Sequence, residues 1–120
     1  MLVVEDDPAL RELYRSALRA AGFAVIAVGD GAAALRHIEE WRPSVVVLDL
    51  ALPHVSGRDV HRELSSRAET RGIPIVVVSG TDMSDLNEDD FASLLNKPVD
   101  LESLVSNVER AIRRTRPTEP

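Results

Sequence analysis

The chain contains no cysteine, and only four of its 120 residues are aromatic. Without cysteine, disulfide bonds, zinc–thiolate sites and thiol nucleophiles are excluded. The apolar runs span only a few residues, far short of the roughly 20 that a membrane-spanning helix needs. Glu5, Asp6 and Asp7 also stand where the apolar core of a secretion signal would lie, so we expect no signal peptide. These observations predict a cytoplasmic protein that does not associate with membranes.

Positive charge is also scarce, with 14 basic residues against 20 acidic ones and a net charge of −6. A surplus of acids and few stacking side chains both argue against direct binding of nucleic acid. Lys97 is the only lysine, and every other basic residue is arginine. Because an ammonium is a compact point charge on a flexible stem, this residue is a candidate for a role that arginine cannot fill.

The chain alternates short apolar segments with helical patterns, as expected for one domain of this length. Asp7 followed by Pro8 is typical of a helix start, and Gly22 of a helix end. Five strands alternating with five helices predict an α/β fold with a parallel sheet covered on both faces. The expected strands are residues 2–4, 23–28, 45–48, 73–78 and a short piece at 94–95.

The carboxyl ends of parallel strands are where such sheets bind ligands. Glu5 and Asp6 follow the first predicted strand and Asp49 follows the third. Carboxylates gathered in one pocket repel one another unless a cation offsets them, and hard oxygen ligands favour Mg²⁺. Asp49 could serve as a metal ligand or as a nucleophile that attacks a phosphoryl group. Ser79 and Lys97, at later strand ends, offer a hydroxyl and a positive charge to phosphoryl oxygens.

Four segments together resemble the receiver domain of two-component response regulators, and the resemblance covers the whole chain. They are Leu2-Val3-Val4-Glu5-Asp6-Asp7, Val46-Val47-Leu48-Asp49-Leu50 with Pro53 and Gly57, Val77-Val78-Ser79-Gly80, and Lys97-Pro98-Val99-Asp100. The resemblance implies a single-domain, flavodoxin-like, doubly wound sheet of five parallel strands in the order 2-1-3-4-5, with five helices.

The resemblance also assigns roles to individual residues. Asp49 would be the phosphoacceptor, with Ser79 as the hydroxyl residue and Lys97 as the lysine of the site. Asp6 would bind Mg²⁺ directly, Glu5 would act through a water molecule, and the carbonyl of Ala51 would be a further ligand. A cis peptide bond between Lys97 and Pro98 is implied as well.

The implied function is a phosphorylatable signalling switch rather than a metabolic enzyme. The domain would take a phosphoryl group from a sensor histidine kinase or a histidine phosphotransfer protein, and later lose it by hydrolysis. A monomer or weak homodimer is expected. A phosphorelay shuttle, or the receiver part of a hybrid kinase, remains an alternative within the family.

The sequence departs from the family pattern in three respects. The residue three before the lysine, usually aromatic in the family, is Leu94. Only 18 positions separate Ser79 from Lys97, so the fourth helix is expected to be short or irregular. The chain also begins almost within its first strand, which suggests a fragment of a longer protein. We expect a receiver domain at 1–115 and a C-terminal tail or linker at 116–120.

Three other interpretations compete with this one. Gly29, Gly31 and Ala34 match a G-x-G-x-x-A dinucleotide-binding motif, and Asp49 lies 20 residues after the first glycine. The acids at 5–7 could simply cap a helix, which is the better interpretation for Asp7. A non-phosphorylated interaction domain is the third. The histidines at 37, 54 and 61 lack metal-ligand spacing and are expected at the surface.

Overall fold

The structure is a computed structural model that describes residues 1–115, so the expected tail at 116–120 lies outside the described residues. Strands and helices alternate along the chain as the sequence predicts. The elements are β1 (Leu2–Val4), α1 (Pro8–Ala20), β2 (Ile26–Val28), α2 (Gly31–Trp41), β3 (Val46–Leu48), α3 (Gly57–Ser65), β4 (Ile75–Ser79), the 3-10 helix η1 (Glu88–Asp90), β5 (Ser93–Asn96) and α4 (Leu101–Thr115).

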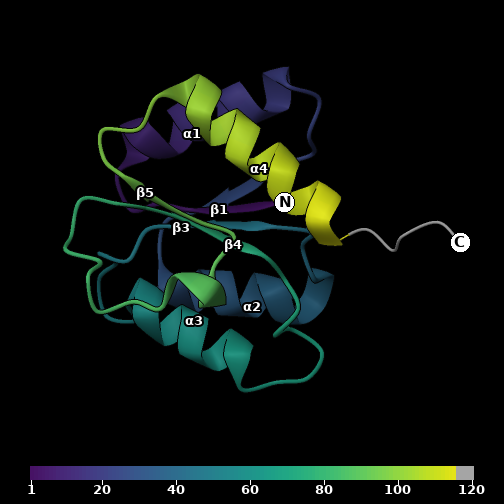
Figure 1. Ribbon diagram of the computed structural model, residues 1–120, viewed down its shortest axis with the longest axis vertical. Coiled ribbons are helices and arrows are strands. Elements are labelled where there is room, and N and C mark those ends of the chain that lie inside the picture. Colours follow the sequence, from purple (N-terminus) through teal and green to yellow (C-terminus); the bar gives the residue numbers. More distant parts are fainter. Residues whose placement is uncertain (116–120) are drawn as a thin grey trace, which may run out of the picture.

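All five strands form one parallel sheet in the order β2-β1-β3-β4-β5, which confirms the predicted fold and strand order. Helices α1 and α4 cover one face of the sheet, and α2 and α3 cover the other (Figure 1). Among residues 1–115, no helix is both long and apolar enough to cross a membrane. Because helices cover both faces, the sheet has two separate hydrophobic layers, one on each face.

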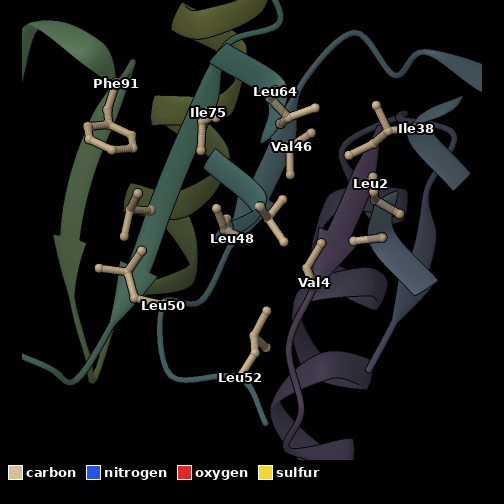
Figure 2. Close-up of a cluster of buried hydrophobic side chains, with 13 residues drawn as sticks. Leu2, Val4, Ile38, Val46, Leu48, Leu50, Leu52, Leu64, Ile75 and Phe91 are labelled. Atoms are coloured by element: carbon tan, nitrogen blue, oxygen red, sulfur yellow. The ribbon is translucent and has the colours of Figure 1, made fainter. Parts of the chain in front are cut away.

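The central strands supply both layers because alternate side chains point to opposite faces of a strand. Leu2, Val4 and Leu48 pack toward α2 and α3 (Figure 2), whereas Val3 and Val47 pack toward α1 and α4. Full burial of one such side chain contributes roughly 1.5–3 kcal/mol. Burial on both faces explains why these strands are continuous apolar runs rather than alternating ones.

Side-chain caps start three helices close to the carboxyl edge of the sheet. Asp7 accepts from the N–H groups of Ala9 at 2.9 Å and Leu10 at 3.2 Å, which confirms its capping role. Asp30 accepts from the N–H of Ala33 at 2.7 Å. Ser56 begins α3 with a reciprocal capping box that pairs it with the third residue of the helix. Each cap lets its helix begin directly after the loop that leaves a strand at this edge.

The expected fourth of five helices is reduced to one 3-10 turn, so the described residues contain four α-helices. Segment 80–91 is too short for a full crossover helix and is rich in acidic and small polar residues that favour turns. It is held instead by Met83 and Leu86, which pack on the core, and by Arg58. The Arg58 guanidinium donates to the carbonyl of Asp82 at 3.0 Å and to the Asp85 carboxylate at 2.8 Å.

Packing explains the glycines of the G-x-G-x-x-A motif. A Cβ at Gly31 would lie 2.2 Å from the carbonyl oxygen of Val55, and one at Gly29 would lie 2.6 Å from Nη1 of Arg11. Protein atoms therefore occupy the space beside both glycines. Close packing against backbone, rather than the approach of a dinucleotide, therefore accounts for glycine at position 31, whereas the neighbour of Gly29 is the movable end of the Arg11 side chain.

Gly57 has a similar role directly behind the carboxyl edge, where its substitution should be costly. A Cβ at this position would lie 2.2 Å from the carbonyl oxygen of Asp49, so Gly57→Ala must displace backbone. We expect the free energy of unfolding to fall by about 1–3 kcal/mol, measured by urea denaturation and circular dichroism. Gly72→Ala is the control, because open space surrounds that site. An equal loss in both variants would contradict the packing explanation.

His61 differs from the expected surface position because it is half-buried against segment 80–91. Its ring lies 4.4 Å from that of Phe91, centroid to centroid, at an interplanar angle of 39°. Burial lowers the pKa of His61, and nearby Arg62 acts in the same direction, while Asp90 opposes the shift. The neutral imidazole is therefore favoured in the folded protein.

This burial predicts that acid weakens the contact between α3 and segment 80–91. Because the pKa of His61 is lower folded than unfolded, the unfolded chain takes up the proton first as the pH falls. Stability contributed by the neutral ring is present above the unfolded pKa, near 6.5, and is lost below it. Urea denaturation at pH 7.5 and 5.5 should show this loss in the wild type and a smaller one in His61→Gln. An undiminished loss in the variant would assign the effect to other groups.

Candidate functional site

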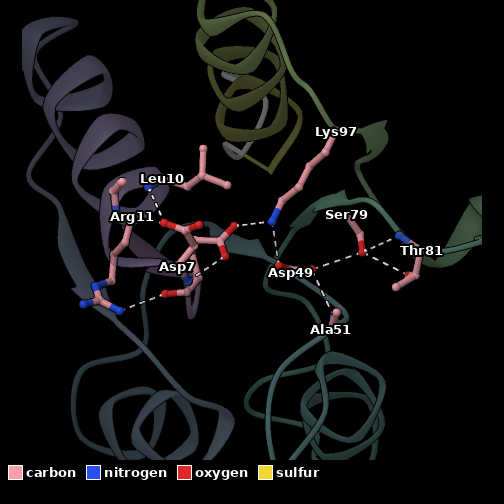
Figure 3. Close-up of polar contacts among 10 residues, drawn as sticks. Asp7, Leu10, Arg11, Asp49, Ala51, Ser79, Thr81 and Lys97 are labelled. Carbon is pink, nitrogen blue, oxygen red and sulfur yellow. Dashed lines mark hydrogen bonds and ion pairs between the residues drawn. The ribbon is translucent and has the colours of Figure 1, made fainter.

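Polar side chains from four strand ends meet at the carboxyl edge of the sheet (Figure 3). Glu5 follows β1, Asp49 follows β3, Ser79 ends β4 and Lys97 follows β5. Glu5 and Asp49 lie side by side because β1 and β3 are neighbours in the sheet. Both carboxylates are almost fully buried, with side-chain exposures of 1% and 4%. The fold thus removes two anions from water at one point.

Lys97 supplies the cation that compensates this burial. Its Nζ lies 2.6 Å from Oε1 of Glu5 and 2.8 Å from Oδ2 of Asp49. The peptide bond between Lys97 and Pro98 is cis, as the resemblance implied. Because an unpaired buried carboxylate is costly, the single ammonium stabilises both acids at once.

Asp49 also accepts neutral hydrogen bonds on its other oxygen. Oδ1 accepts from the hydroxyl of Ser79 at 3.0 Å and from the N–H of Ala51 at 3.0 Å. The carboxylate is therefore held on one side by an ammonium and on the other by a hydroxyl and a backbone amide. These three donors fix its orientation while leaving it ionised.

The pKa values of the two acids move in opposite directions. Burial raises the pKa of Glu5 more than the Lys97 ammonium and the N–H of Asp7 lower it. Burial also opposes ionisation of Asp49, but its bonds from Lys97, Ala51 and Ser79 lower its pKa overall. Bonds to both acids outweigh burial and raise the pKa of Lys97. The shifts of Asp49 and Lys97 both favour the charged form of each group.

Glu5, Asp6 and Asp49 form a group that fits a divalent cation. Each offers one carboxylate oxygen, and these atoms lie within 4.8 Å of one another. Oε1 of Glu5 is buried, and within residues 1–115 its partner is the Lys97 ammonium at 2.6 Å. Asp6 is exposed, so the group opens to solvent. A set of hard oxygen donors with room for waters suits Mg²⁺.

The structure therefore brings together the residues singled out in the sequence. Glu5, Asp49, Ser79 and Lys97 are in direct contact, and Asp6 lies within the carboxylate group. Ala51 contacts Asp49 through its N–H, whereas the proposed use of its carbonyl remains a prediction.

Two residues that contribute to the site escaped the sequence analysis. Thr81 lies 3.0 Å from Ser79, oxygen to oxygen. Arg11 donates from Nη1 to the carbonyl of Glu5 at 3.1 Å. The only signal for Thr81 was its closeness in sequence, since Gly80 alone separates it from Ser79. Arg11 gave no such signal, because its contact with the Glu5 carbonyl depends on how α1 is placed beside the end of β1.

Leu94 occupies the position where the resembled family usually has an aromatic residue. It lies on β5, is half-buried and packs against the hydrophobic layer on the α2 and α3 side of the sheet. A leucine here offers no ring that could exchange between buried and exposed positions.

Comparison with known proteins agrees with this geometry. The family model described as the response regulator receiver domain matches residues 1–109. The chain is 40% identical, over 95% of its length and 50% of the relative's, to a DNA-binding response regulator, MtrA, from Mycolicibacterium smegmatis.

Two solved structures are similar along nearly the whole chain. A sensor protein from Polaromonas sp. JS666 has a TM-score of 0.88 at 30% identity, with 96% of both chains covered. The receiver domain of a sensor histidine kinase from Pseudomonas aeruginosa PAO1, with magnesium in its active site cleft, has a TM-score of 0.83 at 26% identity, covering 93% of this chain and 95% of that one. The chain spans about half the length of the curated relatives it matches.

The ion pairs of Lys97 predict a large stability loss in Lys97→Met. Removing one partner of a buried pair costs about 3–5 kcal/mol, because the remaining charge is left without compensation. We expect urea denaturation at pH 7 to show a loss in this range. The deficit should shrink as the pH falls, because the unpaired folded carboxylates take up protons before the unfolded ones do.

The control is Arg15→Met, which removes an exposed pair with Glu12. Exposed pairs contribute about 0–1 kcal/mol, so this variant should remain near wild type. A similar loss in both variants, or a Lys97→Met deficit that stays constant with pH, would contradict the charge compensation.

Proposed function

Because this chain belongs to the response regulator receiver domain family, we propose that it accepts a phosphoryl group on Asp49 and acts as a two-component signalling switch. The donor in this proposal is a phosphohistidine of a sensor histidine kinase or of a histidine phosphotransfer protein. The receiver family is a class of signalling switches rather than metabolic enzymes. Asp49, Ser79, Lys97, Glu5 and Asp6 would perform the chemistry.

One observation supports the proposal most directly: the Asp49 carboxylate has a lowered pKa and is held by two donors, Ser79 and Lys97, that can also bind phosphoryl oxygens. An attacking aspartate must be an anion, and the Asp49 pKa is lowered. Lys97 and Ser79 already contact its two oxygens. Both donors can turn toward the oxygens of an incoming phosphoryl group without a large movement of the backbone.

In the proposed transfer, a carboxylate oxygen of Asp49 forms a bond to phosphorus while the phosphorus–nitrogen bond of phosphohistidine breaks. The electron pair of that bond returns to the imidazole. Negative charge on the phosphoryl oxygens is then shared by the Lys97 ammonium and the Ser79 hydroxyl. Hydrolysis of the acyl phosphate would later restore Asp49 and release inorganic phosphate.

Glu5, Asp6 and the carbonyl of Ala51 are the proposed protein ligands of Mg²⁺, together with Asp49. When bound, Mg²⁺ would neutralise charge on the phosphoryl group and align it with the attacking oxygen. Lys97 currently pairs with Glu5 and Asp49, so a cation at Glu5 would compete with one of its two ion pairs. Release from Glu5 would leave the ammonium free to follow the phosphoryl group.

Phosphorylation would shift an existing conformational equilibrium rather than create a new state. The proposed shift begins when Ser79 and Lys97 move toward the phosphoryl oxygens. Ser79 leads directly into segment 80–91, which lacks a regular helix. We therefore expect this segment, rather than an aromatic side chain on β5, to carry the change outward.

The output of the whole protein is also a proposal. One curated relative is named a DNA-binding response regulator and another a probable transcriptional regulatory protein. Both are about twice as long as this chain, so any DNA binding would reside in a separate part. The solved neighbours include receiver domains of sensor kinases, which supports the hybrid kinase or phosphorelay shuttle as a second candidate. A cytoplasmic location suits either role.

The proposal predicts that acetyl phosphate with Mg²⁺ adds one phosphoryl group to the protein. Intact-mass spectrometry should show the adduct in the wild type and in Asp89→Asn, but not in Asp49→Asn. Asp89 is the matched control because it is an exposed aspartate in η1. Omitting Mg²⁺, or combining Glu5→Gln with Asp6→Asn, should strongly reduce the yield.

A rapidly hydrolysed adduct would escape detection, so beryllofluoride binding is measured in parallel as a stable mimic of the phosphoryl group. No adduct and no beryllofluoride binding in the wild type would overturn the proposal. So would an adduct that persists in Asp49→Asn.

A further inference from the structure

Thr81 contacts the reactive carboxylate indirectly, through Ser79. The hydroxyl oxygens of Ser79 and Thr81 lie 3.0 Å apart. The backbone N–H of Thr81 also donates to Oγ of Ser79 at 3.3 Å. Both groups of one residue therefore converge on a single atom of the site (Figure 3).

The direction of these hydrogen bonds follows from proton counting. A serine hydroxyl carries one proton, and that of Ser79 is donated to Oδ1 of Asp49 at 3.0 Å. An ionised carboxylate has no proton to offer in return. In the contact between Ser79 and Thr81, the threonine hydroxyl must therefore be the donor. Protons point in one direction along the chain, from Thr81 to Ser79 to Asp49.

We propose that Thr81 is a positioning residue for phosphoryl transfer, which aims the Ser79 hydroxyl at Asp49 and at the group that Asp49 receives. This inference rests on the function proposed above. Two donors from Thr81 occupy the lone pairs of Ser79 Oγ, so the remaining proton has one favourable direction. Without them, the hydroxyl could rotate and spend part of its time pointing elsewhere. Thr81 does not touch the reacting atoms and acts only through Ser79.

The surroundings of Thr81 can hold it in this position. Thr81 is half-buried, Ser79 is fully buried, and only Gly80 separates them. The residue after Thr81 is anchored through its carbonyl by Arg58, which donates to it at 3.0 Å. The start of segment 80–91 is thus tied to the site at one end and to α3 at the other.

The experiment compares the rate of Asp49 phosphorylation by acetyl phosphate at saturating Mg²⁺. Thr81→Val keeps the shape of the side chain but removes its hydroxyl. Loss of one hydrogen bond corresponds to a rate about 3- to 10-fold lower. Thr81→Ser should restore the rate, and Ser84→Ala, which removes an exposed hydroxyl from the same segment, should leave it unchanged.

Two further measurements separate positioning from a general structural effect. In a Ser79→Ala background, Thr81→Val should change the residual rate by less than about twofold, because a residue that acts through Ser79 has nothing left to orient. Mg²⁺ affinity should match the wild type, and the change measured by urea denaturation should not exceed the effect of one lost hydrogen bond, since the backbone N–H is retained.

The outcomes distinguish this inference from the proposed function. A wild type that fails to become phosphorylated overturns the proposed function, and this inference with it. If the wild type is phosphorylated and the Thr81→Val variant reacts at the same rate, only the inference about Thr81 is overturned. An equal slowing with and without Ser79, or a failure of Thr81→Ser to restore the rate, has the same consequence.

Discussion

The ammonium of Lys97 between two buried carboxylates is the interaction on which the site depends. Glu5 and Asp49 are nearly inaccessible to water, and like charges so close together cannot both ionise cheaply. The Lys97 ammonium offsets the repulsion between the two carboxylates by pairing with both. Its flexible stem would let it change partners if a metal ion or a phosphoryl group were bound. A guanidinium would be a poorer choice because its rigid, planar fork favours one fixed partner. These contacts give a physical reason for lysine at position 97, in a chain whose other 13 basic residues are arginine.

The sheet order creates the meeting point that this cation serves. In the order β2-β1-β3-β4-β5, the strands that end in acids are adjacent, and those that end in Ser79 and Lys97 follow in sequence. Caps at Asp7, Asp30 and Ser56 then turn the chain into helices soon after each loop, so that little flexible backbone surrounds the site. The helices make this edge rigid, and segment 80–91 is the part of the edge that contains no α-helix.

Much of this could be predicted from the sequence because it follows from local patterns. Apolar runs predicted the central strands, and the acids directly after these runs predicted a ligand site at the carboxyl edge of the sheet. The boundaries were less accurate where burial is incomplete: the second strand was expected from residue 23 but begins at Ile26, which is half exposed. Edge strands have one neighbour, so their limits depend on pairing rather than composition.

Other features depend on contacts between distant parts of the chain. Nothing near His61 in the sequence indicates that Phe91 will lie against it, because the two residues are distant in sequence and meet only in the folded domain. The role of Thr81 was hidden because Ser79-Gly80 resembles an ordinary turn. The expected shortening of the fourth helix was confirmed. That one 3-10 turn remains, and that Arg58 holds the preceding residues at Asp82 and Asp85, is evident only from the tertiary structure.

The scarcity of lysine has a practical consequence for spectroscopy. Only one side chain among the 120 residues carries a primary amine, and it lies at the reactive carboxylate. Reductive methylation with an isotope-labelled reagent therefore places a single side-chain NMR probe in the site, separate from any signal of the N-terminal amine. Chemical shifts of that one methylated amine would follow the proposed metal binding and phosphorylation of Asp49 in real time, with no engineered label.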